Sequence, residues 1–329
     1  MTRSTVRATA TRIALLLLAC ALALAGFGIL GGCAGGQSSA EKSAGSASSD
    51  TRTSAADFPV TVTDDASRTV TIKSRPERIV SLAPANTEIL FALGLGDKVF
   101  GVTTYCDYPA EAQDKPKIGD FVSPNLEAIA AARPDLVLAT GGVQADVISK
   151  LESLGAKVVV LDPQSVDDVR TAIKMTGRVT GAVEKSLEVD RELQAAIEDV
   201  ASAAPEGATP ASAFIEIGQN PLFTAGPGTL LDDMVRIAYG ANIVTESGYV
   251  AYSLEQLAEK DPAVYLATKG SMSDPSDLSK RPGYGNLDAV KSGRVYVLDD
   301  NLVTRPGPRI GEGLLTIAKA LHPDWTFAE

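Results

Sequence analysis

The side chains that most often carry out catalysis are scarce in this chain of 329 residues. His322 is the only histidine, and it lies beside Pro323 near the end of the sequence. A Ser-His-Asp or Cys-His arrangement therefore has no base, and one histidine with one free thiol cannot make a usual zinc site. The sequence has neither a G-x-x-x-x-G-K-[ST] phosphate loop nor a G-x-S-x-G elbow. Carboxylates are abundant, so an acid–base pair stays open, although no spacing marks one.

The start of the chain has the pattern of an export signal. Three arginines precede an apolar, uncharged run over 13–30, and Cys33 follows two glycines. This pattern resembles a bacterial lipoprotein signal, in which the cysteine is lipidated and becomes the first residue of the mature chain. An uncleaved membrane helix is the alternative, because the run is nearly long enough to span a bilayer. A Gly/Ser-rich stretch follows, so we predict a signal peptide over 1–32 and a tether over 33–57.

The net charge excludes some partners. Without residues 1–32, which hold three basic and no acidic side chains, the chain has 27 basic and 41 acidic residues and a net charge of −14. Nucleic acid or an anionic membrane surface is therefore not expected to be the main partner. Cys20 leaves with the signal and Cys33 is the expected lipid site, so Cys106 alone remains and no internal disulfide can form. We expect an extracytoplasmic domain anchored to the cell membrane by its lipid.

Strands alternate with helices in both halves of the sequence. In the first half, a hairpin over 60–63 and 69–72 precedes strands expected at 78–82, 99–102, 136–139 and 157–161. Helices are expected there from Pro84 to Gly94, over 126–132 and over 147–154. In the second half, strands are expected at 213–217, 264–267 and 294–298, and helices at 230–239, 254–259 and 311–321. This order predicts an α/β fold of two Rossmann-like lobes, over 58–164 and 205–329, with mostly parallel sheets covered on both faces.

The two halves also share a repeat. Residues 126–140 align with residues 254–268, and seven of the fifteen aligned residues are identical. The expected N-cap residues before the two helices, Asn125 and Ser253, correspond as well. Two related lobes explain this match better than chance.

A helical pattern separates the lobes. Between residues 165 and 204, apolar residues recur mostly at steps of three or four, which draws a stripe down one helical face. Ser165 can cap the start, while Pro205 and Gly207 end the pattern. We predict one linking helix over 165–204, about 60 Å long. Two shorter helices meeting at Gly177–Gly181 are the alternative, because each glycine disfavours a helix by about 1 kcal/mol.

Two lobes without catalytic apparatus indicate a binding protein. Ligands of α/β sheets lie outside the carboxyl ends of the strands. This rule selects the loops at 84–86, 105–108, 121–124, 140–143, 219–228, 247–252, 269–272 and 301–309.

Several segments near these loops resemble segments of a known protein family. Residues 81–88, 105–109, 125–127 and 218–226 resemble the cobalamin-binding proteins of ABC importers. That family belongs to the helical-backbone class of substrate-binding proteins, which also serves siderophores and haem. The resemblance covers roughly residues 75–321. It implies a rigid linking helix, little lobe closure, no enzymatic activity and no cofactor other than a bound cobalt corrinoid. It also implies a monomer that delivers its ligand to a permease dimer with ATPase subunits.

The resemblance also implies which side chains line the cleft. By position they are Tyr105, Phe121, Phe223 and Tyr249, with Arg305 and Arg309 nearby. Aromatic faces suit the flat apolar parts of a corrin, and polar loop groups suit its amide rim. Packing in the core is the alternative for each aromatic, and a solvated surface charge is the alternative for Arg305. Cys106 is expected to be a small buried thiol rather than a ligand of the metal.

This sequence departs from the family at one point. The relatives have several tryptophans in the cleft, whereas this chain has only Trp325, near its end. Another corrinoid, a truncated precursor such as cobinamide, or a different chelate therefore stays open. A ferric siderophore or haem on the same scaffold is the nearest alternative, although an anionic siderophore should need several convergent cations. A secreted α/β enzyme with a carboxylate pair is a remote one.

Glu127 and Glu255 are candidates for contact with a partner. Each occupies the second position of an expected helix, where the N-terminal dipole favours a carboxylate by roughly 0.3–1 kcal/mol. A purely structural role is the alternative. The repeat places one such glutamate on each lobe, and the resemblance implies that this pair docks onto arginines of the two permease subunits.

Overall fold

The computed structural model describes residues 57–270 and 272–327. The predicted signal peptide, Cys33 and the tether up to residue 56 lie outside the described residues. No helix within the described part is both long and apolar enough to cross a membrane. All described residues belong to one structural unit.

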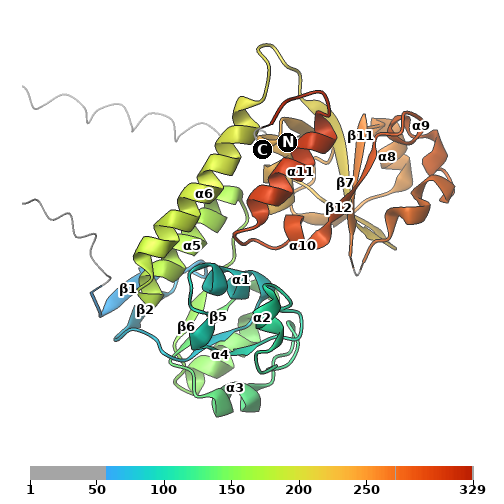
Figure 1. The fold of residues 1–329 in the computed structure, drawn as a ribbon. Helices are drawn as coiled ribbons and strands as arrows, with labels where there is room; N and C mark the ends of the chain where they lie inside the picture. The colour runs from blue at the N-terminus through green and yellow to red at the C-terminus, as the bar shows by residue number, and fades with distance from the viewer. Residues whose placement is uncertain (1–56, 271, 328–329) are drawn as a thin grey trace, which may run out of the picture. The chain divides into compact units, whose positions relative to one another are not determined.

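The first lobe is a parallel sheet with helices on both faces (Figure 1). A hairpin of β1 (Val60–Thr63) and β2 (Thr69–Ile72) precedes it. The sheet has the order β4-β3-β5-β6, formed by β3 (Ile79–Ser81), β4 (Val99–Val102), β5 (Leu136–Ala139) and β6 (Val158–Val160). Its helices are α1 (Pro84–Ala92), α2 (Ala110–Gln113), α3 (Leu126–Ala132) and α4 (Ala145–Ser153).

Alternate residues of β5 show why its sequence is a continuous apolar run. Leu136 and Leu138 pack in the core cluster that contains α1, whereas Val137 and Ala139 pack in the cluster that contains α3 and α4. Successive side chains of a strand point to opposite faces. A strand that is covered on both faces therefore has no polar side to show.

The second lobe is a mixed sheet. Its order is β10-β8-β7-β11-β12, and β9 also pairs with β7. Parallel pairs join β7 (Ala211–Gln219) to β9 (Gly240–Asn242) and β11 (Val264–Lys269), and β11 to β12 (Val295–Asp299), whereas β8 (Leu222–Ala225) pairs antiparallel with both β7 and β10 (Tyr249–Ala251). The helices are α7 (Leu230–Ile237), α8 (Leu254–Lys260), α9 (Asp288–Lys291), α10 (Asp300–Val303) and α11 (Ile310–Leu321). The sequence predicts β7, β11 and β12 but misses β8, β9 and β10, which are three or four residues long.

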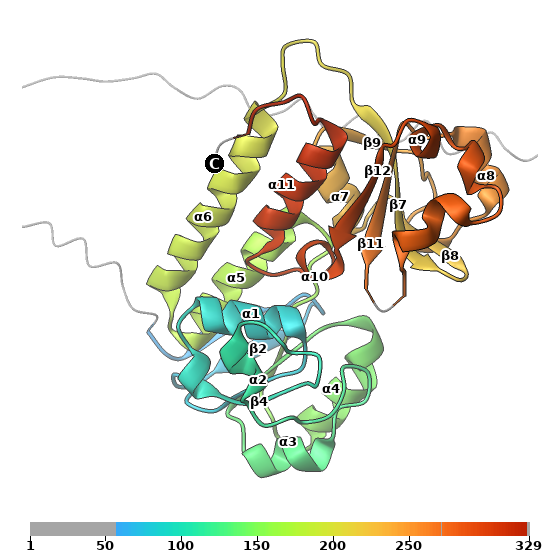
Figure 2. The same ribbon diagram turned by 45° about the vertical axis from the view of Figure 1, so that its right-hand side comes forward.

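The segment between the lobes consists of two helices, α5 (Val166–Thr180) and α6 (Val183–Ser202), which lie side by side (Figure 2). The prediction of one unbroken helix over 165–204 is therefore wrong, and the alternative of two helices is confirmed. Gly181 ends α5 in the left-handed conformation, with a φ of 74°. A Cβ on Gly177 would lie 2.2 Å from Oγ of Ser186, so only glycine allows the two helices to approach this closely.

One long helix nevertheless connects the lobes. It is α6, which has 20 residues and is about 30 Å long, half the predicted length. The predicted fold class of two α/β lobes joined by a long helix is confirmed, with this correction.

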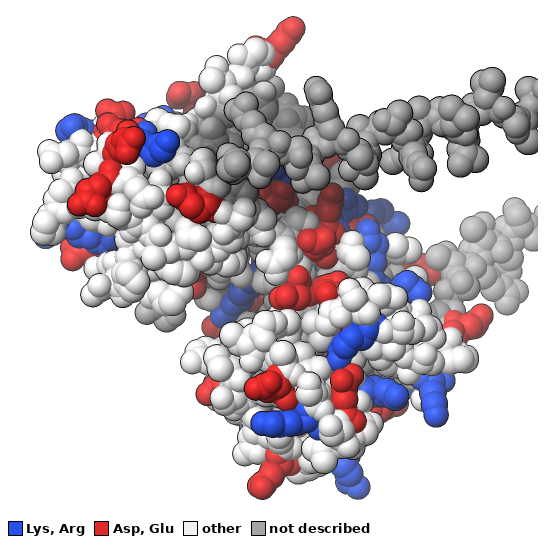
Figure 3. Space-filling model, turned by 180° about the vertical axis from the view of Figure 1, so that it is seen from behind, with Lys and Arg blue, Asp and Glu red and all other residues white. Residues whose placement is uncertain are grey.

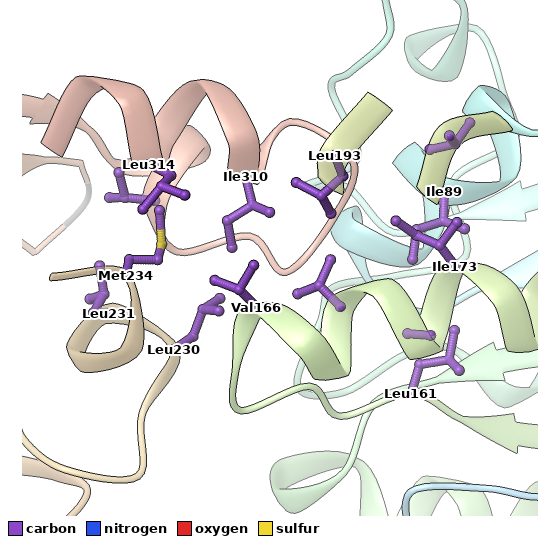
Figure 4. Packing of buried hydrophobic residues seen from close by; sticks show 14 of the residues in the cluster. Ile89, Leu161, Val166, Ile173, Leu193, Leu230, Leu231, Met234, Ile310 and Leu314 are labelled. Atoms are coloured by element: carbon purple, nitrogen blue, oxygen red, sulfur yellow. The ribbon is translucent and has the colours of Figure 1, made fainter. Parts of the chain in front are cut away.

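A continuous hydrophobic core runs from one lobe to the other (Figure 4). Ile89 belongs to the first lobe, Ile173 and Leu193 to the linking helices, and Ile310 and Leu314 to α11, and all belong to one cluster. Gly311 of α11 faces α6, where an added Cβ would meet Ala196 at 3.1 Å. Because interiors are close-packed, a change in the angle between the lobes would disturb this shared core.

The repeat predicted from the sequence is visible in the structure. Asn125 caps α3 by accepting hydrogen bonds from two backbone N–H groups, and Ser253 caps α8 within a capping box. Both helices end at a residue in the left-handed conformation, Arg133 with a φ of 46° and Asp261 with a φ of 39°. The same helix-to-strand unit is therefore built into each lobe.

Candidate ligand-binding cleft

Two of the four predicted cleft aromatics lie on one face of a β-ribbon. In the antiparallel pair of β8 and β10, Phe223 is opposite Ala251 and Tyr249 is opposite Ala225. Cross-strand partners share a face, and so do residues two apart along a strand. Phe223 and Tyr249 therefore project from the same face, with Phe223 partly buried and Tyr249 47% exposed.

The other two predicted aromatics belong to loops of the first lobe. Tyr105 follows β4 and is 59% exposed, so it is not a core residue. Phe121, in the loop before α3, is partly buried. Both lie on loops that we expect to border the ligand, and their contact with a ligand stays a prediction.

A cavity of about 550 Å³ opens beside the ribbon of the second lobe. Its lining includes Phe223, Pro221 and Met272, together with polar groups of Gln219 and Asn220. Met272 is among the most exposed large apolar side chains of the described residues. An apolar wall with a few polar groups is the usual composition of a small-molecule site.

A buried ionic cluster holds the loop that carries Met272. Glu216 of β7 is fully buried, and its carboxylate accepts hydrogen bonds from Oη of Tyr265 at 2.5 Å, from Arg281 at 2.8 Å and from the hydroxyl of Ser273. Burial and the negative charge of Glu216 raise the pKa of Tyr265, so the phenol remains protonated and donates. Sequence patterns gave no sign of this cluster, because its members are far apart in the chain.

Gln144 ties together three loops of the first lobe. Its Nε2 donates to the carbonyl oxygens of Leu82 and Phe121, both at 2.8 Å, and its Oε1 accepts from the backbone N–H of Thr140 at 3.0 Å. The side chain is fully buried. Gln144 therefore sets the position of the loop that carries Phe121, a role that the sequence analysis missed.

The two predicted cleft arginines are joined to carboxylates of the first lobe. Glu88 of α1 accepts from Arg309 Nε at 2.9 Å and Nη2 at 2.7 Å, and from Arg305 Nη1 at 3.2 Å. Arg305 Nη1 also donates to Asp107 at 2.6 Å. Arg309 lies over the ring of Tyr108, 3.8 Å from its centroid. We call Glu88, Asp107, Arg305 and Arg309 the inter-lobe ion cluster.

Asp107 of this cluster is held in its ionised form. The hydrogen bond from Arg305 lowers the pKa of Asp107, so its carboxylate stays ionised. A general acid at neutral pH needs the opposite shift. Asp107 is therefore not a candidate general acid, and no group of three metal-ligating side chains of the His, Cys, Asp and Glu types occurs among the described residues.

The remaining candidates for chemistry are packed into the fold. Cys106 is buried, with its Sγ 3.1 Å from Oγ1 of Thr87 and 3.2 Å from Oγ1 of Thr103, as expected for a structural thiol. His322 stacks on Trp325 and donates from Nε2 to the carbonyl oxygen of Tyr239 at 3.0 Å. Cys106 belongs to the cleft loop at 105–108, but its side chain is buried, and His322 lies outside the cleft loops.

Glu127 and Glu255 occupy equivalent positions on the two lobes. Both are exposed in the first turn of their helices, α3 and α8, and neither carboxylate has an ion-pair partner among the described residues. On the face shown in Figure 3, acidic and basic side chains are interspersed rather than gathered into a basic stripe.

Comparison with known protein families identifies the family of this chain. A family model described as periplasmic binding protein matches residues 79–302. The chain belongs to the periplasmic binding protein family. This confirms the resemblance that the cleft segments carry.

Individual relatives of this periplasmic binding protein are named for transport and binding. It is 37% identical over 280 residues to an uncharacterized ABC transporter substrate-binding lipoprotein, YvrC, of Bacillus subtilis. The aligned region covers 83% of this chain and 88% of that protein. It is 30% identical over 286 residues to a cobalamin-binding protein of Halobacterium salinarum, covering 82% and 75% of the two chains. A solved periplasmic heme binding protein from Pseudomonas aeruginosa matches with a TM-score of 0.69 at 26% identity, covering 77% and 95%.

Proposed function

We propose that this protein is the substrate-binding component of an ABC importer and that it captures cobalamin or a related corrinoid between its lobes. The observation that carries the proposal is the placement of Phe223 and Tyr249 on one face of the β8–β10 ribbon, beside the cavity lined by Met272. A corrin has flat apolar faces, and two aromatic rings on one wall can pack against such a face. The cobalamin-binding relative in Halobacterium salinarum supports this choice of ligand.

The first lobe supplies the opposite wall. Tyr105 and Phe121 both lie in the connection between β4 and α3, before and after α2, and Gln144 fixes the Phe121 loop. Backbone and amide groups on the same loops suit the amide rim of a corrinoid. Because this chain lacks the cleft tryptophans of the family, a smaller corrinoid such as cobinamide is a natural second ligand.

Delivery requires an anchor and a docking surface. We assign the anchor to a lipid on Cys33, outside the membrane, in agreement with the lipoprotein relative of Bacillus subtilis. We assign docking to Glu127 and Glu255, since the repeat offers one exposed carboxylate on each lobe. A permease dimer with ATPase subunits is the partner that fits such a pair.

Haem is the second candidate ligand. The match to the haem-binding protein of Pseudomonas aeruginosa favours it. The one histidine of this chain lies at the C-terminal end of α11, one helix away from the 301–309 loop, and is packed on Trp325, so it is not a candidate axial ligand. An exposed tyrosine such as Tyr105 would have to serve instead.

Equilibrium dialysis of the purified protein against cyanocobalamin and cobinamide tests the proposal. Phe223→Ala should weaken binding of the preferred corrinoid by about 1–3 kcal/mol, the usual worth of a stacked aromatic with its buried area. Phe100→Ala is the matched control, because Phe100 is also partly buried but belongs to β4 of the first lobe, where Arg78 lies over its ring at 3.7 Å. Equal losses in the two variants would refute the assignment of the cleft.

A further inference from the structure

The inter-lobe ion cluster contains two carboxylates and two guanidinium groups, so its charges balance. Glu88 is 3% exposed, and the side chains of Arg305 and Arg309 are 14% and 16% exposed. Asp107, with a side chain that is 52% exposed, is the one member open to solvent. Each arginine already donates to at least one carboxylate oxygen at hydrogen-bonding distance.

The cluster lies where ligands of α/β sheets bind. Asp107 follows the carboxyl end of β4, while Arg305 and Arg309 follow the carboxyl end of β12 through α10. Burial raises the pKa of Asp300, at the start of α10, and the positive charge of Arg305 opposes part of this rise. The two arginines therefore lie where a ligand would bind, but Glu88 and Asp107 already neutralise their positive charge.

Few other cations are available there. The eight loops that follow the strands contain three basic residues, which are Lys269, Arg305 and Arg309. Lys269 is exposed at the end of β11 and has no ion-pair partner among the described residues. Among the described residues of these loops, an anionic ligand would thus meet only Lys269 as a cation without an ion-pair partner, or it would have to displace Glu88 or Asp107 from an arginine.

We infer that the inter-lobe ion cluster makes the cleft selective for ligands without a net negative charge, because Glu88 and Asp107 neutralise the arginines that would otherwise pair with carboxylates or catecholates. This inference rests on the proposed cleft and narrows its ligand class. Displacing a carboxylate from an arginine leaves a charge without its partner, which costs more than a new exposed contact returns. An amide-rimmed corrinoid makes no such demand, whereas the two propionates of haem do.

Asp107 is the position at which the selectivity can be changed. Its carboxylate is exposed, and Arg305 holds it by a single contact, whereas Glu88 is buried and holds both arginines. Asp107→Asn keeps the shape of the side chain and removes its charge. Arg305 then keeps part of its positive charge free to face the cleft.

The test compares haem with haem dimethyl ester, which has the same ring without the negative charges. Dissociation constants of both are measured for the wild type, Asp107→Asn and the double variant Asp107→Asn/Arg305→Gln. Asp107→Asn should raise the preference for haem over its ester by about tenfold, the worth of one charged hydrogen bond. The double variant should lose that gain. Asp114→Asn is the control, since it removes one exposed carboxylate of the same lobe that has no arginine partner in the described part of the chain.

Different results would contradict the inference and the proposed function. An unchanged preference in Asp107→Asn, including no detectable haem binding, would overturn the inference, as would an equal gain in Asp114→Asn. Asp107→Ser, measured in the same way, replaces Asp107→Asn if that variant does not fold. Cyanocobalamin and cobinamide are titrated in parallel: a wild type that binds neither of them contradicts the proposed function, while the comparison of haem with its ester still tests the inference.

Discussion

Arg309 of the second lobe donates to both carboxylate oxygens of Glu88 in the first lobe, from Nε at 2.9 Å and from Nη2 at 2.7 Å. The two residues are 221 positions apart in the sequence. A bidentate guanidinium–carboxylate pair fixes orientation as well as distance. Together with the hydrophobic core shared by α1, the linking helices and α11, it holds the carboxyl edges of the two sheets at one separation.

Glu88→Ala should destabilise the protein by about 3 kcal/mol, because it leaves two largely buried arginines without their carboxylate. The measurement is the free energy of unfolding in urea, followed by the fluorescence of Trp325, the single tryptophan. Glu111→Ala, at an exposed position of α2, should change it by no more than about 0.5 kcal/mol. A similar decrease in the free energy of unfolding for both variants would show that the contacts of Glu88 with the two arginines do not stabilise the arrangement of the lobes.

Gln144→Leu should destabilise the protein by about 2–3 kcal/mol, since the carbonyl groups of Leu82 and Phe121 and the N–H of Thr140 lose their partner in the interior. Hydrogen exchange at the Thr140 amide should speed up, and affinity for the corrinoid should fall as the Phe121 loop loses its position. Gln194→Leu, on the surface of α6, is the control. Unchanged exchange at Thr140 would contradict the positioning role.

Glu127→Ala combined with Glu255→Ala should abolish uptake and leave ligand affinity intact, because the two carboxylates are exposed and lie in the first turns of α3 and α8. Transport of a labelled corrinoid into cells checks this. Asp146→Ala combined with Glu259→Ala removes two exposed carboxylates from α4 and α8 and should leave uptake normal. Normal transport by the Glu127/Glu255 variant would refute docking.

Stability should fall in mild acid partly through His322. Burial and the positive charge of Arg294 lower the pKa of His322 below its ordinary value of about 6.5. Between that value and the lower pKa of the folded protein, the unfolded chain binds a proton that the folded protein does not. The free energy of unfolding therefore decreases as the pH falls below about 6.5.

His322→Gln isolates this contribution. Urea unfolding at several values of pH between 7.5 and 5 should show a smaller loss of stability in the variant than in the wild type. Parallel pH profiles for the two proteins would mean that His322 has the same proton affinity in both states.

The regular part of the fold could be predicted because its signals are local. Apolar runs mark β3, β5 and β6, and N-cap residues such as Asn125 and Ser253 mark the helices that repeat. The strands β8 to β10 were missed because they are short, and β9 includes Gly240 and Asn242, residues that are uncommon in strands. Their existence depends on pairing with neighbours that are distant in sequence.

The break in the linking segment and the chemistry of the cleft depend on tertiary contacts. From the sequence, Gly177 indicates only a position of low helix propensity. Its close approach to Ser186 in the structure shows that two helices pack against each other there. Arg305 and Arg309 could be placed near the cleft by resemblance. Their neutralisation by Glu88 and Asp107 has no local pattern, since it joins residues about two hundred positions apart.

Calorimetric titration with cyanocobalamin, cobinamide, haem and a ferric siderophore tests the central claim most directly. The account predicts heat of binding to a corrinoid with one ligand per protein, and weaker or no binding of haem and of an anionic siderophore. Binding of haem or the siderophore with no heat from either corrinoid would contradict it.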